Sequence, residues 1–440
     1  MKNKLRRNSL IFAFIGSVAV AALYWMGLFI NFEDKSLDFR FKMRGVEKPQ
    51  SPVVVAAMDD DSMARIGKPP WRRMVHAKLV DKLTKAGASA IVFDVLFYEP
   101  DNDRPQDDLA FARAIRKSKR TVCAYSFDYS EVPVSQVNEK GETVVVSIST
   151  VTKAEPVELI VGEAAAVGYV NSFPDPDGNL RRAHPVFWYE GEKYAALNLL
   201  AVSVAQNKSP DEIMQNVTTI DSVPGGWGYP GREVLVNYRG PKDGTFNTYS
   251  YADILEGFVP DEWLKGKIVL VGSTALGYFD HYNTPFQTQF PGVFFHANII
   301  DNLWANDFLK PVSSWVTLLL IFLFGVVGSG MFVPRLSPWL GAVTALAGSA
   351  LFWGFGYLLM TRKLFALELV APIISLLGNY IVVFFYRFII EQREKAGIKK
   401  AFGVYVNPHV VDQIAKNPDG LKLGGEMREK ATVLNHVANS

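Results

Sequence analysis

The chain has 440 residues, of which 49% are hydrophobic and 20% are charged, and its formal net charge is +2. That length could form two or three soluble domains, but four apolar segments are long enough to cross a membrane as helices. A wholly soluble protein is therefore excluded. The predicted transmembrane helices are 9–30, 312–333, 338–360 and 364–386.

Basic residues near the ends of these helices predict how the chain is oriented in the membrane. Residues 1–8 carry four basic side chains, and 387–440 carry nine basic against six acidic ones. The region 31–310 carries 30 basic against 37 acidic side chains. We therefore expect both ends in the cytoplasm and 31–310 outside it. The first segment could instead be a cleaved signal peptide, but its length and the absence of a cleavage pattern after Ile30 favour an uncleaved anchor.

Short β-branched runs alternate with amphipathic segments in the exported region, and this order predicts an α/β domain with a mainly parallel sheet and covering helices. The part from 126 to 231 is less regular and is interpreted as a β-rich insert. Because Cys123 is the only cysteine, core burial rather than a disulfide must stabilise the domain. The predicted strands are 53–58, 90–97, 121–125, 233–238 and 267–274, and the predicted helices are 72–86, 107–117 and 291–308.

Polar side chains follow several predicted strands at their carboxyl ends, where parallel sheets bind ligands. We interpret seven of them, two from a following loop, as a candidate pocket for a polar ligand or a divalent ion. The alternative is that the acidic residues cap helices and turns. The set is Asp59, Asp60, Asp94, Ser273, Thr274, Asp280 and His281.

Two short motifs suggest ion or phosphate binding but lack essential parts. The run from Asp175 to Asn179 is similar to the start of a calcium loop, yet its twelfth position is Val186 instead of glutamate, so a tight turn is preferred. Gly272-Ser273-Thr274 lacks the lysine and spacing of a phosphate loop and is interpreted as strand-end packing. No histidine pair has metal spacing, and no hydrolytic motif is present.

A series of motifs recurs in order through the exported region. They are Asp38-x-Arg40-x-Lys42, Val53 to Asp61, Trp71-x-Arg73 with His76-Ala77, Phe93-Asp94-x-x-Phe97, Asn171 with Asp175-x-Asp177-Gly178, Asn237-Tyr238-x-Gly240, Gly266 to Ser273, Thr284-Pro285, and Pro291-Gly292-Val293 with His296-Ala297-Asn298. This series resembles the second type of the CHASE domain, an extracytoplasmic sensory module of cyclases and histidine kinases. The resemblance implies a sensor behind one transmembrane helix and ahead of three.

The region after the last transmembrane helix carries further motifs. They are Lys400-Ala401-Phe402-Gly403-x-Tyr405-Val406, Leu423-Gly424-Gly425-Glu426-x-Arg428-Glu429 and Thr432-Val433-Leu434. This pattern is similar to the lead-in of class III adenylate and guanylate cyclases, in which the strand continues to a metal-binding aspartate. Here Asn435, His436 and Val437 follow, and the chain stops at Ser440. Val437 offers no oxygen ligand to Mg²⁺.

The resemblance implies the sensory and transmembrane part of a class III adenylate cyclase, truncated before its catalytic core, in the bacterial inner membrane. We expect no enzyme activity and no cofactor in this chain, since Mg²⁺ or Mn²⁺ would belong to an intact cyclase core. The expected partners are the membrane, an unknown extracytoplasmic ligand or protein, and a second copy in a homodimer or higher homo-oligomer, but no nucleic acid. The alternative is a stand-alone membrane-anchored binding or assembly protein without cyclase output.

The predicted organisation follows from these arguments. It is a cytoplasmic N-terminus at 1–8, transmembrane helix 1 at 9–30, the sensor domain at 31–310, transmembrane helices 2 to 4 at 312–333, 338–360 and 364–386, a signalling helix and cyclase lead-in at 387–434, and a tail outside the family at 435–440.

Overall fold

A computed structural model of the chain describes residues 2–402, apart from 138–142, 223–230, 276, 278–280 and 333–334. Side chains are described over this range except at 2–4, 129–137, 143–151, 221–222, 281, 332 and 398–402. The predicted cyclase lead-in beyond Phe402 and the tail 435–440 lie outside the described residues. The described residues form two compact units, a membrane unit (within 2–23, 318–350 and 371–402) and an α/β unit (within 24–317 and 351–370).

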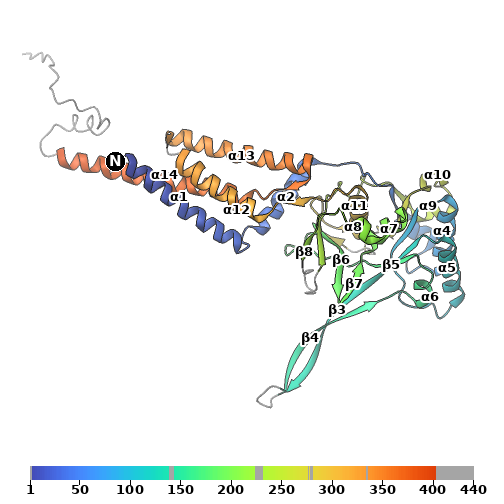
Figure 1. Ribbon diagram of the computed structural model, residues 1–440. Coiled ribbons are helices and arrows are strands. Elements are labelled where there is room, and N and C mark those ends of the chain that lie inside the picture. The colour runs from blue at the N-terminus through green and yellow to red at the C-terminus, as the bar shows by residue number, and fades with distance from the viewer. Residues whose placement is uncertain are drawn as a thin grey trace, which may run out of the picture. The chain divides into compact units, whose positions relative to one another are not determined.

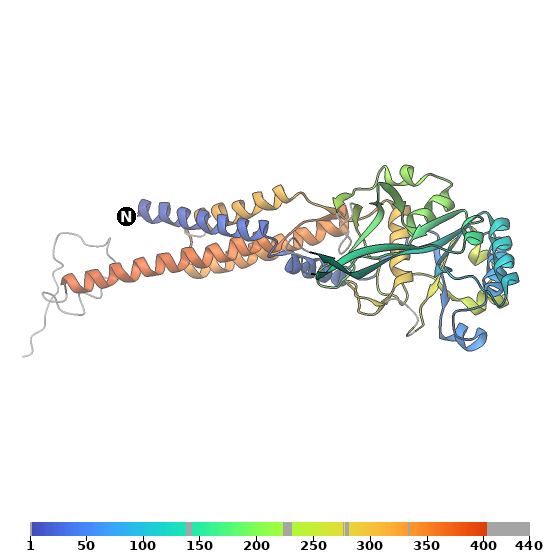
Figure 2. The ribbon, with the colours of Figure 1, turned by 90° about the horizontal axis from the view of Figure 1, so that it is seen from below.

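Four helices are long and apolar enough to cross a membrane, as predicted. The first helix ends at Trp25 instead of Ile30 because Gly27 adopts a positive φ of 76°, and α2 (Ile30–Arg44) begins after that turn. The last begins at Val370, after the short strand β15 (Phe365–Ala366), and continues unbroken through the predicted signalling helix (Figure 2). The four are α1 (Lys2–Trp25), α12 (Ser314–Phe322) with its π-helical continuation η1 (Leu323–Phe332), α13 (Pro338–Lys363) and α14 (Val370–Phe402).

Within the membrane unit, α1, η1 and α14 approach one another at small residues. A Cβ on Gly325 of η1 would lie 2.1 Å from Ser17 Oγ of α1 and 2.4 Å from Ser375 Oγ of α14. Asn379 Nδ2 donates to Ser17 Oγ (3.1 Å), and Ser375 Oγ donates to the Ile321 carbonyl (2.8 Å). Because lipid provides little hydrophobic force between helices, close packing and hydrogen bonds of this kind stabilise the bundle.

The α/β unit is built on a seven-stranded sheet that is mostly parallel, as predicted. Its order is β10-β1-β11-β2-β3-β4, with β5 also paired to β3, and β3 pairs with β4 in the antiparallel direction. The strands are β1 (Val53–Met58), β2 (Ala90–Leu96), β3 (Thr121–Val137), β4 (Thr143–Ala154), β5 (Ala166–Tyr169), β10 (Thr248–Ser250) and β11 (Ile268–Ser273).

Every residue of β1 is buried, and alternate side chains enter two different hydrophobic cores. The odd-numbered residues from 53 to 57 pack with α7 (Leu197–Gln206) and α11 (Gly292–Ala305). The even-numbered residues from 54 to 58 pack with α4 (Arg73–Ala86) and α5 (Pro105–Ser118), which lie side by side in Figure 1. Burial on both faces explains why the parallel strands are continuous apolar runs.

The region from 126 to 231 contains a hairpin and a second sheet. β3 continues to Val137 and pairs with β4 from Ser126 onward, so the two form a long hairpin that projects from the α/β unit (Figure 1). The second sheet is antiparallel, in the order β7-β6-β9-β8. Its strands are β6 (Arg182–Tyr189), β7 (Glu192–Ala195), β8 (Ile220–Ser222) and β9 (Gly231–Leu235).

Short elements complete the described chain. They are α3 (Asp60–Ile66), α6 (Glu158–Val161), α8 (Pro210–Met214), α9 (Tyr251–Glu256), α10 (Asp261–Leu264), β12 (His281–Tyr282), β13 (Phe290–Pro291) and β14 (Lys310–Pro311).

Candidate functional site

A cavity of about 370 Å³ lies at the carboxyl ends of the neighbouring strands β1, β11 and β2. Parallel sheets hold ligands at this edge, and small-molecule sites typically measure ~300–1,000 Å³. Asp94 and Ser273 line the cavity from β2 and β11. Most of the remaining wall is apolar or aromatic and includes Met58, Trp71, His76, Leu96 and Phe97.

Local features of β2 and β11 direct Asp94 and Ser273 toward the cavity. The register between β2 and β3 shifts between Val92 and Leu96, and such a bulge re-aims the side chains beside it. On β11, a Cβ on Gly272 would lie 2.7 Å from Val293 Cγ2, so glycine is what lets α11 pack this closely. Ser273 Oγ is buried and has no hydrogen-bond partner among the described residues. The cavity therefore holds a hydroxyl available to a ligand.

His76, in the first turn of α4, contributes an aromatic wall of the cavity. Its ring lies 5.2 Å from that of Phe97, and its Nδ1 is 3.0 Å from the Tyr251 hydroxyl. Burial lowers the pKa of His76 to about 3, so the ring is neutral at physiological pH. Arg73 stacks its guanidinium 4.9 Å from the Phe97 ring, and its Nε lies 3.4 Å from Asp108 Oδ1.

A second cavity of about 290 Å³ adjoins the first. Three of its charged lining residues are paired, since Arg72 Nε lies 2.9 Å from Asp107 Oδ2 and Arg104 Nε lies 3.3 Å from Asp101 Oδ2. The cavities share the wall made by Pro70, Trp71, Arg73 and Leu96. A ligand in the first cavity would thus contact residues that also border the second.

Two of the predicted pocket residues have other positions. Asp59 is the N-cap of α3, where its Oδ1 accepts the Ser62 N–H (2.8 Å) and the Ser250 hydroxyl (2.9 Å). Asp60 is exposed in the first turn of that helix. Neither residue lines the cavity, and Asp59 has the helix-capping role of the alternative interpretation, while a ligand role for either residue stays a prediction.

Three further predicted pocket residues are Thr274, Asp280 and His281, and the side chain of only the first is described. Thr274 donates its backbone N–H to the Met58 carbonyl (3.2 Å) and does not line the cavity, so its predicted role as a pocket residue stays a prediction. Asp280 lies outside the described residues, and only the backbone of His281, in β12, is described. We missed Trp71 and His76 because they come from the start of a helix and its preceding loop instead of from strand ends, although both occur in the family motifs.

The Asp175–Asn179 segment is a tight turn, as predicted. Gly178 has a φ of +81°, and its N–H donates to the Asp175 carbonyl at 2.8 Å. The carboxylates of Asp175 and Asp177 accept hydrogen bonds from Arg181 (2.9 and 2.8 Å), and the bonds from Arg181 lower the pKa of Asp177. Among the described residues, no group of three or more His, Cys, Asp or Glu side chains is placed to hold a metal ion.

Arg181 also anchors α2 to the start of β6 within the α/β unit. Its side chain is fully buried, and its Nε and Nη2 donate to the two oxygens of Asp38 at 2.8 and 2.7 Å. The neighbouring Arg182 donates to Asp34 at 3.3 Å. Charge-assisted hydrogen bonds of this kind are among the strongest in proteins. The helix that follows α1 is therefore held firmly against the antiparallel sheet.

We call a second cluster in the α/β unit the membrane-edge network; it consists of Tyr24, Glu33, Arg40, Thr317 and Glu368 with the backbone of 367–370. Glu33 Oε2 accepts the N–H groups of Leu369 (2.8 Å) and Val370 (2.9 Å) at the start of α14. A carboxylate satisfies the unpaired donors and positive dipole of a helix start. Burial raises the pKa of Glu33, partly offset by Arg40.

Arg40 and Glu368 extend the membrane-edge network. Arg40 is 1% exposed and donates to Glu33 (2.8 Å) and to the Leu367 carbonyl (3.0 Å). Glu368 accepts hydrogen bonds from Tyr24 at the end of α1 (2.6 Å) and from Thr317 near the start of α12 (2.7 Å). One cluster thus joins α2 to those ends of three predicted transmembrane helices that belong to the α/β unit.

Comparison with protein families gives one match. A family model described as CHASE2 domain matches residues 15–330, which include the whole predicted sensor domain and parts of the two flanking helices. No curated protein and no solved structure matches the chain.

Proposed function

Because the chain belongs to the CHASE2 domain family of extracellular sensors, we propose that it is a membrane-bound receptor in which the α/β unit binds a ligand and α14 carries the signal. The four apolar helices support the membrane attachment. The cavity at the sheet edge supports ligand binding, since its volume, apolar wall and buried Ser273 hydroxyl suit a small molecule.

The observation that carries the proposal is the contact of Glu33 with the start of α14. Glu33 belongs to α2, and α2 is anchored to the sensor through Asp38 and Arg181. A ligand shifts an equilibrium between two states when it binds one of them more tightly. A ligand that binds more tightly to one position of α2 would therefore favour one arrangement of the start of α14. α14 then continues without a break as far as Phe402.

We propose cyclic-nucleotide synthesis as the output, through a class III adenylate cyclase core joined after α14. The support is the similarity of residues 400–434 to the cyclase lead-in. We also propose a homodimer, because class III catalytic sites form between two domains. The basic residues in 1–8 and 387–440 support a position of both chain ends in the cytoplasm, at a bacterial inner membrane. In this proposal the described residues sense the ligand and transmit the signal, and they carry out no catalysis. Any Mg²⁺ or Mn²⁺ would be bound by the cyclase core.

Glu33→Ala is expected to change output at least about fivefold, since allosteric couplings are typically worth ~1–3 kcal/mol. The test joins residues 1–434 to an active class III cyclase domain in cells that lack their own cyclase, and measures cyclic AMP at matched expression. Glu47→Ala is the control, because Glu47 is 37% exposed and pairs with Arg44 and Arg239, away from α14. Equal output from wild type and Glu33→Ala would count against transmission through Glu33 and favour the stand-alone binding or assembly protein.

A further inference from the structure

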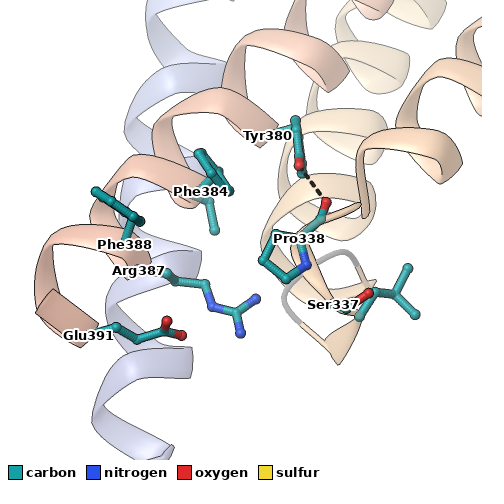
Figure 3. A pocket seen from close by; sticks show the side chains of 9 residues that line it. Ser337, Pro338, Tyr380, Phe384, Arg387, Phe388 and Glu391 are labelled. Carbon is teal, nitrogen blue, oxygen red and sulfur yellow. Dashed lines mark hydrogen bonds between the residues drawn. The ribbon is translucent and has the colours of Figure 1, made fainter. Parts of the chain in front are cut away.

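A groove lies in the membrane unit between α14 and the segment that leads into α13 (Figure 3). One wall is a ladder of aromatic rings on α14, in which Tyr380 stacks on Phe384 (6.1 Å) and Phe384 on Phe388 (6.3 Å). The Tyr380 hydroxyl donates to the Pro338 carbonyl at 2.8 Å and so fixes the opposite wall. Of these residues, tyrosine is of the type enriched where the hydrocarbon core of a membrane meets its headgroups.

The polar end of the groove holds one positive and one negative side chain. Arg387 is the first charged residue after the uncharged run 369–386, and Glu391 follows one helical turn later. In Figure 3 both side chains extend from α14 toward Ser337 and Pro338. Arg387 Nε is buried and has no hydrogen-bond partner among the described residues. A buried guanidinium donor without a partner costs free energy, which an acceptor from a ligand would recover.

The same end of the membrane unit contains the start of α1. Asn8 Nδ2 donates to the Tyr386 hydroxyl at 2.8 Å, and the ring of Phe12 lies 4.8 Å from that of Tyr386. The exposed Arg6 and Arg7 therefore lie near this end of α14 as well. The transition from an apolar helix surface to basic side chains is typical of the membrane–water boundary.

We infer that this groove binds a phospholipid whose headgroup carries both a phosphate and a primary ammonium. The phosphate accepts hydrogen bonds from Arg387 and the Ser337 hydroxyl, and the ammonium donates to Glu391. One acyl chain lies along the ladder from Phe388 to Tyr380. The enclosed space is about 40 Å³, so part of the headgroup enters it and the remainder of the lipid covers the exposed ring of Phe388.

The charge pattern of the groove distinguishes this headgroup from others. A purely anionic headgroup would pair with Arg387 but meet repulsion from Glu391. A trimethylammonium headgroup carries both charges but has no N–H to donate to the carboxylate. The inference does not depend on which ligand the sensor domain binds. It adds a lipid contact to α14, so membrane composition would bias the helix that carries the signal.

The experiment measures lipid retention by native mass spectrometry of the full chain in detergent, with equal amounts of phosphatidylethanolamine, phosphatidylglycerol and phosphatidylcholine. The wild type is expected to retain at least about fivefold more phosphatidylethanolamine than either other lipid, since a hydrogen bond to a charged group is typically worth more than a fivefold ratio requires. Arg387→Gln is expected to lower the retention of all three lipids, because each carries the phosphate that Arg387 binds, and Arg387→Lys is expected to keep most of it. Glu391→Gln is expected to lower phosphatidylethanolamine and raise phosphatidylglycerol.

The opposite response of two lipids to Glu391→Gln separates a headgroup site from a purely structural role of Arg387 and Glu391. Arg393→Gln is the control, since Arg393 lies on the same helix outside the groove and its loss should leave the lipid ratios unchanged. Equal retention of all three lipids by the wild type would overturn the inference. An effect of Arg393→Gln as large as that of Arg387→Gln would also overturn it, because general basic charge would then explain the binding.

Discussion

Arg181→Met is expected to destabilise the α/β unit by about 3–5 kcal/mol, the usual cost of leaving buried charges without their partner. Arg181 is fully buried and donates to Asp38, Asp175 and Asp177. Removing the guanidinium leaves these three carboxylates without their shared partner, and Asp175 among them is buried. Urea unfolding of the purified chain, followed by tryptophan fluorescence, measures the change.

Arg65→Met is the matched control for this prediction. Arg65 also pairs with three carboxylates, those of Asp61, Asp253 and Glu256, but its side chain is 27% exposed and its acidic partners are more exposed still. Because water screens such pairs, we expect no measurable shift of the unfolding transition. Similar shifts in the two variants would mean that burial of Arg181 has no special importance.

Gly325→Val is expected to disrupt the packing of the membrane unit. The first added carbon alone would lie 2.1 Å from Ser17 Oγ and 2.5 Å from Asn379 Nδ2, distances at which helices must separate. Overpacking of this kind typically costs ~1–3 kcal/mol or more, and separation would also break the hydrogen bond from Asn379 to Ser17. The measurement is the temperature at which half of the detergent-solubilised chain leaves the monodisperse peak in size-exclusion chromatography.

Gly354→Val, in α13, controls for adding a β-branched residue to a transmembrane helix. A Cβ at Gly354 would meet no atom within 4 Å, so the melting temperature should stay close to that of the wild type. A loss of stability confined to Gly325→Val would establish the close approach of α1, η1 and α14. Equal losses would instead point to the helix propensity of valine.

The parallel sheet and the four apolar helices could be predicted because each depends on local sequence. Residues 53–58 form an apolar run because both faces of β1 are buried. Such a run can be recognised in the sequence without knowing which strands lie beside it. The extension of β3 to Val137 was harder to predict because Pro133 argues against a strand. It is tolerated because, among the described residues, β3 pairs there with β4 alone, which leaves one edge of the strand without a described partner.

The candidate site was less predictable because its contacts join distant parts of the chain. Asp94 and Ser273 follow from the rule that ligands bind at strand ends, but His76 enters the cavity from a helix start. Glu33 gave no signal in the sequence, since its partners are backbone N–H groups at 369 and 370. A backbone group has the same chemistry at every residue, so no pattern marks which one a carboxylate will bind.

The central claim is that α2, anchored to the sensor, holds the start of α14 through Glu33. Hydrogen–deuterium exchange of the full chain in lipid nanodiscs, read on peptides that cover 367–372, tests it most directly. We predict that Glu33→Ala speeds exchange at Leu369 and Val370 about 10- to 100-fold, as expected for hydrogen bonds to a charged group worth ~1.5–3 kcal/mol. Peptides from β1 should exchange as in the wild type. Unchanged exchange at 369 and 370 would contradict the account.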